Sequence, residues 1–147
     1  TPIFVDVEQN SLNIDPTALE KAITPRTKAI CIVHYGGIGA DLDKILEIAK
    51  ANNLAVIEDN AHGLFSTYKG KPLGGFGNLA TQSFHETKNI TCGEGGALLI
   101  NDESLVERAE ILREKDSLVA EIAELTLADR YREEFADFFE AFRLLCR

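Results

Sequence analysis

The sequence predicts an α/β protein with a mostly parallel sheet of about five strands in three layers, followed by a C-terminal helical tail. Strand and helix signals alternate along residues 1–100, which is typical of parallel sheets with crossover helices. The inner strand candidates are continuous apolar runs, as expected for strands covered on both faces. Residues 116–147 contain no glycine or proline and carry apolar residues every three or four positions, which predicts an amphipathic helix.

The first part of the chain predicts two strand–helix units. Residues 3–7 form a short apolar run and are expected to be the first strand. Asp15 before Pro16 predicts a helix start, because aspartate caps helix N-termini and proline is tolerated in the first turn. Residues 29–34 predict a buried strand, and Asp41 predicts the start of a second helix with apolar residues at helical spacing.

The next part of the chain continues the alternation. Residues 54–57 predict a second buried strand, and residues 63–77 are rich in glycine, which leaves a hairpin or an irregular loop open. Residues 79–84 and 97–100 predict two further strands, the second antiparallel at one side of the sheet, and residues 103–115 predict a helix. The apolar stripe of the tail has two open interpretations, packing against the sheet or association with a partner.

Composition excludes several classes of function. The formal net charge of −9 argues against a nucleic-acid partner, which would require a basic face. The three cysteines form no C-x-x-C pair, and the histidines have no partner at a metal spacing, so we expect a reducing compartment and no metal. No apolar run approaches the ~20 residues of a membrane span. We therefore expect a cytoplasmic protein without a membrane or nucleic-acid partner.

Two residues at predicted strand ends carry the functional prediction. Lys88 follows the strand at residues 79–84, and Asp59 follows the strand at residues 54–57. Parallel strands in α/β sheets bring such ends to one edge, where ligands bind. A pyridoxal phosphate (PLP) enzyme needs an amine for its Schiff base and a carboxylate for its pyridine nitrogen. A lone loop lysine is usually only a surface charge, so the prediction depends on the pair.

Two more residues near this edge could contact a cofactor. His62 lies three positions after Asp59 and could stack on or hydrogen-bond to a cofactor ring, although a core or supporting role is equally open. The hydroxyl of Ser83 could donate to a phosphate, or it could be an ordinary strand hydroxyl.

Four segments of the sequence resemble one known family. They are F-V-D-V with L-N-I-D-P, R-T-K-A-I-C-I-V-H-Y-G-G, V-I-E-D-N-A-H-G-L-F-S-T-Y-K-G-K-P-L-G and S-F-H-E-T-K-N-I-T-C-G-E-G-G-A-L-L-I-N-D. Residues 2–115 thereby resemble the DegT/DnrJ/EryC1/StrS family of PLP-dependent sugar aminotransferases, and within it the bacterial transaminases of dTDP-4-keto-6-deoxy-glucose.

The resemblance implies a role for each candidate residue. Lys88 would be the Schiff-base lysine, Asp59 the partner of the pyridine nitrogen, His62 a contact of the cofactor's ring oxygen, and Ser83 a phosphate contact. Lysine at position 88 resembles the aminotransferases rather than the related dehydratases, which carry histidine there. The implied reaction transfers an amino group, usually from glutamate, to a nucleotide-linked keto sugar in polysaccharide biosynthesis.

The resemblance also implies a division of the chain. Family members are more than twice this length, so we expect residues 1–115 to be a partial PLP-transferase large domain and residues 116–147 to be a helical tail unrelated to the family pattern. We expect a homo-oligomer, with the chain alone lacking full activity and binding PLP weakly. The alternatives are a non-catalytic truncated or relic domain that self-associates through its C-terminal helix, and an engineered truncation with no cellular role.

Overall fold

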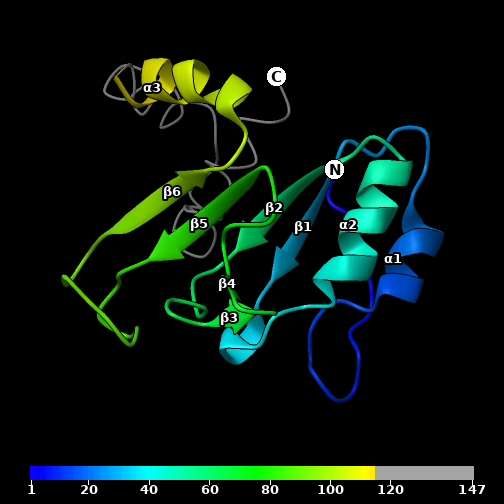
Figure 1. The fold of residues 1–147 in the computed structure, drawn as a ribbon, viewed down its shortest axis with the longest axis horizontal. Helices are drawn as coiled ribbons and strands as arrows, with labels where there is room; N and C mark the ends of the chain where they lie inside the picture. The colour runs from blue at the N-terminus through cyan, green and yellow to red at the C-terminus, as the bar shows by residue number, and fades with distance from the viewer. Residues whose placement is uncertain (115–147) are drawn as a thin grey trace.

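A computed structural model describes residues 1–114 of the chain, and Figure 1 shows its arrangement. The elements in chain order are α1 (Pro16–Ala22), β1 (Ala29–Val33), the short 3-10 helix η1 (Tyr35–Gly37), α2 (Leu42–Ala51), β2 (Ala55–Asp59), β3 (Thr67–Tyr68), β4 (Lys71–Pro72), β5 (Leu79–Ser83), β6 (Gly96–Ile100), η2 (Glu103–Leu105) and α3 (Val106–Glu114). The predicted α/β class is confirmed. The predicted helical tail at residues 116–147 lies outside the described residues.

The main sheet has four strands in the order β1-β2-β5-β6. β1, β2 and β5 are parallel, and β6 pairs antiparallel with β5, as the sequence predicts for residues 97–100. The register aligns Val33 with Asp59, and Asp59 with Thr81. The C-terminal ends of the three parallel strands therefore meet at one edge of the sheet (Figure 1).

One face of the sheet carries most of the hydrophobic core. Helices α1 and α2 lie side by side against this face (Figure 1). Ile32, Leu42 and Ile45 have no exposed surface, and burying such a side chain contributes roughly 1.5–3 kcal/mol. A smaller cluster on the opposite face joins Ile57 and Leu79 to Leu105 of η2. Alternation along β2 thus sends Val56 and Glu58 to one face, and Ile57 and Asp59 to the other.

The predicted strand at residues 3–7 is wrong, which is why the sheet has four strands rather than about five. This segment makes one isolated bridge, between Val7 and Ile14. Its backbone bonds are local, from Glu8 N to Asn13 O at 2.9 Å and from Asp15 N to Asp6 O at 3.0 Å. Phe4 is 89% exposed. A short apolar run indicates a preference for an extended backbone, but it does not predict whether a neighbouring strand is available for pairing.

The sequence left a hairpin or an irregular loop open for residues 63–77, and the structure contains a hairpin there. β3 and β4 pair antiparallel, with Tyr68 opposite Lys71. Lys69 and Gly70 between them both have positive φ, 51° and 81°, which is the conformation of a tight two-residue hairpin turn. Among residues 1–114, no helix combines the length and the apolar character that crossing a bilayer requires.

Both predicted helix caps are present and give a first testable prediction. The Asp15 side chain accepts a hydrogen bond from Thr17 N at 2.8 Å, with Pro16 in the first turn. Asp15→Ala should lower the free energy of unfolding by about 1 kcal/mol, because a backbone donor loses its acceptor. Urea unfolding followed by circular dichroism measures the change. Asp15→Asn keeps an acceptor and should stay close to wild type; an equal loss in both variants would contradict the capping role.

Candidate active site

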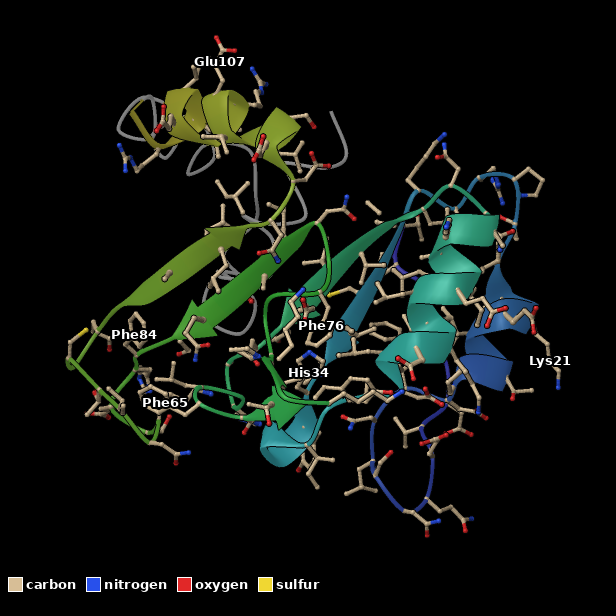
Figure 2. All side chains as sticks on the ribbon, viewed as in Figure 1. Lys21, His34, Phe65, Phe76, Phe84 and Glu107 are labelled. Carbon is tan, nitrogen blue, oxygen red and sulfur yellow. The ribbon has the colours of Figure 1, made fainter. Side chains whose placement is uncertain are left out.

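A cavity of about 430 Å³ lies at the edge where the parallel strands end. Loops after β1, β2 and β5 supply its wall, which includes His62, Ser83 and Lys88. Phe65 and Phe84, labelled in Figure 2, lie on the loops at this same edge. The structure thus brings together three of the four predicted site residues.

Lys88 is carried by a tight turn that follows β5. Its backbone N–H donates to His85 O at 3.0 Å, and the side chain of His85 accepts from Thr87 N at 3.3 Å. The loop is closed at its base by Phe84 N bonding to Gly95 O at 2.8 Å. Lys88 is half-buried, and the ion pairs formed by lysines within residues 1–114 involve Lys44 and Lys69 instead. Its amine is therefore not tied to a carboxylate of that region.

Asp59 is the last residue of β2 and is half-buried. It is not part of the cavity wall but lies at the neighbouring strand end, in register with Thr81, two positions before Ser83. One carboxylate oxygen accepts from Ala61 N at 3.0 Å. Burial raises the pKa of Cys31 to about 12, and the negative charge of Asp59 adds to the increase. Cys31 packs with Ile57 in the smaller cluster, and Asp59 follows Ile57 by two positions on β2, so the Asp59 side chain lies on this same face of the sheet, opposite α1 and α2.

His62 and Ser83 each accept one hydrogen bond from a backbone N–H. His62 is exposed, and its Nδ1 accepts from Gly36 N at 3.3 Å. The Ser83 hydroxyl oxygen accepts from His85 N at 3.4 Å, in a residue that is only 7% exposed. The Ser83 O–H and the second nitrogen of His62 can therefore serve a ligand in the cavity.

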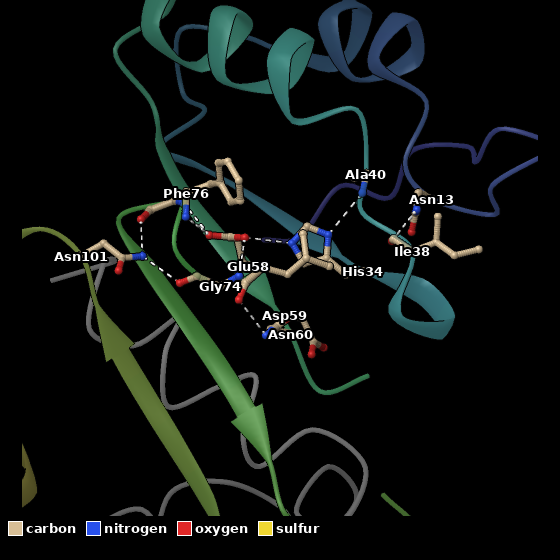
Figure 3. Close-up of polar contacts among 12 residues, drawn as sticks. Asn13, His34, Ile38, Ala40, Glu58, Asp59, Asn60, Gly74, Phe76 and Asn101 are labelled. Atoms are coloured by element: carbon tan, nitrogen blue, oxygen red, sulfur yellow. Dashed lines mark hydrogen bonds and ion pairs between the residues drawn. The ribbon is translucent and has the colours of Figure 1, made fainter. Parts of the chain in front are cut away.

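The structure adds a buried pair that the sequence analysis did not connect. His34 and Glu58 are both fully buried, and His34 Nε2 lies 2.9 Å from Glu58 Oε2 (Figure 3). Three backbone N–H groups of the loop before β5 also donate to the Glu58 carboxylate, those of Gly74, Phe76 and Gly77. The sequence offered only a signal of position, because His34 directly follows β1 and Glu58 is the penultimate residue of the neighbouring parallel strand β2.

This network determines the charge of Glu58. Burial alone raises the pKa of a carboxyl group, but the hydrogen bonds from His34 and from the three N–H groups outweigh it. The pKa of Glu58 therefore lies below its ordinary value, and the group is ionised at neutral pH. Adjacent acids at the end of β2 thus have different environments: Glu58 is saturated with donors inside the core, whereas Asp59 lies on the other face with one described donor.

The fold and the cavity define an α/β protein whose ligand site lies at the carboxyl ends of its strands and carries a lysine. The model of the DegT/DnrJ/EryC1/StrS aminotransferase family matches residues 1–132. The chain belongs to this family, which confirms the resemblance found in the sequence.

Three relatives illustrate the match. The spore coat polysaccharide biosynthesis protein SpsC of Bacillus subtilis is 47% identical over 76% of this chain and 29% of its own length. The crystal structure of DesI with its TDP-sugar product superposes with a TM-score of 0.74 at 35% identity, covering 78% of this chain and 29% of DesI. A Streptococcus pneumoniae protein solved in PLP and PMP forms gives a TM-score of 0.67 at 33% identity, covering 79% and 33%. The chain therefore spans about three tenths of the length of the relatives it matches.

Proposed function

We propose that this chain supplies the lysine-bearing part of a PLP-dependent aminotransferase that acts on a nucleotide-linked keto sugar. The observation that supports it most is that one cavity is lined by His62, Ser83 and Lys88 together, with Asp59 at the adjoining strand end. Family membership supports the aminotransferase class. The PLP and PMP forms of the pneumococcal relative support the cofactor.

The polar groups of the cavity wall, together with Asp59 at the adjoining strand end, suit PLP. Bound PLP supplies an electron sink while a proton leaves a substrate carbon. Lys88 would hold the cofactor through its amine and then carry the proton. The Ser83 oxygen accepts from His85 N, and the Ser83 O–H could donate to a phosphate oxygen. Asp59 has an anionic carboxylate oxygen beyond the one bonded to Ala61 N, which suits a protonated ring nitrogen.

The substrate class and the assembly are parts of the same proposal. A TDP-sugar is the product bound in the DesI structure, and SpsC is named for polysaccharide biosynthesis. We propose a nucleotide-linked keto sugar as acceptor and glutamate as amino donor. We also propose a homo-oligomer, because large apolar side chains beside the cavity are open to solvent, including Phe65 at 82% and Tyr35 at 50% exposure.

Cofactor attachment tests the proposal directly. Adding PLP to the chain should produce an absorbance band, and borohydride reduction should then fix one cofactor mass to the peptide that contains Lys88. Lys88→Ala should abolish both signals, because Lys88 is the only lysine among the described residues that line the cavity. Lys50→Ala, at an exposed position near the end of α2, is the matched control and should keep both. Equal labelling of wild type and Lys88→Ala would overturn the assignment.

A further inference from the structure

The turn after β1 makes a specific contact with His62. Gly36 and Gly37 have φ values of 60° and 79°, a left-handed conformation that glycine adopts without strain. This conformation points the backbone N–H of Gly36 at the imidazole of His62, with 3.3 Å between Gly36 N and Nδ1. The edge of the Tyr35 ring also meets the His62 ring, with centroids 5.9 Å apart at 67°.

A backbone N–H can only donate, so Nδ1 of His62 must be the acceptor and carry no proton. In a neutral imidazole the proton then resides on Nε2. We propose that Gly36 N–H is a positioning group that holds His62 as an Nε2–H hydrogen-bond donor to an oxygen of the ligand in the cavity. The inference rests on the proposed function in one respect, since the oxygen would belong to the ring of the bound cofactor.

Hydrogen bonds with buried side chains hold the turn that carries Gly36. Asn13, which is 2% exposed, brackets it from both sides: its Oδ1 accepts from Tyr35 N at 2.8 Å, and its Nδ2 donates to Ile38 O at 3.0 Å. The preceding residue, His34, accepts from Ala40 N at its Nδ1 and pairs with Glu58 at its Nε2 (Figure 3). The buried His34–Glu58 pair therefore anchors the turn that orients His62.

Close packing leaves no room for a side chain at Gly37. A Cβ there would lie 2.9 Å from His62 O and 3.0 Å from Ser66 Oγ. Gly37→Ala should therefore push the turn away from His62 and break the Gly36 contact. Gly70 is the matched control, because its φ of +81° is equally left-handed but a Cβ would meet nothing within 4 Å.

Nitrogen NMR of the 147-residue chain without cofactor tests the inference. The experiment is run at pH about 8.5, two units above the ordinary pKa of histidine, and the three histidines are assigned by substitution. Wild type should show His62 with a bare Nδ1 and a protonated Nε2, and a Gly36 amide that exchanges about tenfold more slowly than in His62→Ala. Gly37→Ala should speed that exchange and admit the Nδ1-protonated form. Gly70→Ala and His85→Ala should behave as wild type.

Each outcome decides the inference. A protonated Nδ1 in wild type, or a Gly36 amide unaffected by His62→Ala, would overturn it. So would a folded Gly37→Ala variant with wild-type His62 signals. If PLP attaches to Lys88 yet leaves the His62 Nε2 signal unmoved, the donor role is wrong while the proposed function stands. If PLP does not attach, the proposed function fails while the cofactor-free measurement still decides the tautomer.

Discussion

Glu58→Ala should lower the free energy of unfolding by about 4 kcal/mol, the largest effect we expect from a single side-chain truncation in this chain. The carboxylate has no exposed surface and accepts from His34 Nε2 and from three backbone N–H groups. Removing it leaves those four donors buried without an acceptor, and each unpaired donor carries a desolvation penalty. Urea unfolding followed by circular dichroism measures the change.

Two further variants define what the result means. Glu58→Gln keeps the side-chain shape and one acceptor oxygen, but its NH₂ group faces N–H donors that had bonded to the carboxylate. We therefore expect about half the loss in unfolding free energy seen for Glu58→Ala. Glu20→Ala, at an exposed position of α1, should change stability by less than about 0.5 kcal/mol. A Glu58→Ala protein within about 1 kcal/mol of wild type would show that solvent or rearrangement satisfies the donors, contrary to the structure.

The same carboxylate predicts the direction of the pH dependence. Since the folded-state pKa of Glu58 is lower than its unfolded value, the unfolded state binds more protons in the acid range. Its contribution to stability is therefore complete above the ordinary glutamate pKa and is lost as pH falls through the depressed folded value. Glu58→Gln should remove this component, so the difference in unfolding free energy between wild type and Glu58→Gln should shrink on acidification. A difference that grows would contradict the assigned shift.

Gly77→Ala should destabilise the protein by about 3 kcal/mol through the backbone rather than through a lost side chain. A Cβ at Gly77 would lie 2.6 Å from the carbonyl oxygen of Val56. That oxygen accepts from Asn78 N at 2.8 Å, and Gly77 N itself donates to Glu58 at 2.6 Å. Both the entry into β5 and the Glu58 network must shift to admit one methyl group.

Gly75→Ala is the matched control for this variant, because it changes a neighbouring glycine of the same loop. Its nearest contacts would be 3.3 Å away and include the flexible end of Lys71, which can move. Chemical denaturation of both variants should therefore separate them by about 2 kcal/mol. Similar midpoints for the two would mean that the close approach of Gly77 to β2 is not retained in solution.

Several elements were predictable because their signals are local. The caps at Asp15 and Asp41 each act within three residues, and both start helices as predicted. The apolar runs of β1 and β2 predicted parallel strands, and the two strands do pair in parallel. The predicted burial on both faces is wrong for β1, because β1 lies at the edge of the sheet, with Ile30 and Ile32 buried but Val33 44% exposed. The run at residues 3–7 has similar composition but closes on its own following turn. Whether residues 3–7 join the sheet depends on the balance between local hydrogen bonds and hydrogen bonds to a neighbouring strand. Residue types alone do not predict that balance.

The candidate site also has residues whose positions the sequence predicted and one whose position depended on the tertiary structure. Lys88 and Ser83 could be placed because Ser83 is the last residue of β5 and Lys88 lies in the turn that follows, and three of the four predicted residues share the cavity wall. Asp59 lies beside that wall rather than on it, a distinction that depends on the twist and register of neighbouring strands.

The sequence by itself determined the order of strands and helices from residue 29 onward, the family and the residues that can do chemistry, because periodicity, caps and motifs are properties of consecutive residues. Only the tertiary structure decided that Glu58 rather than Asp59 is fully buried, and which ring nitrogen of His62 accepts a hydrogen bond. The physical reason is separation along the chain: His34 meets Glu58 across 24 positions and Gly36 meets His62 across 26. Strand register and the course of the turn after β1 bring these groups together, and neither can be predicted from a short segment of consecutive residues.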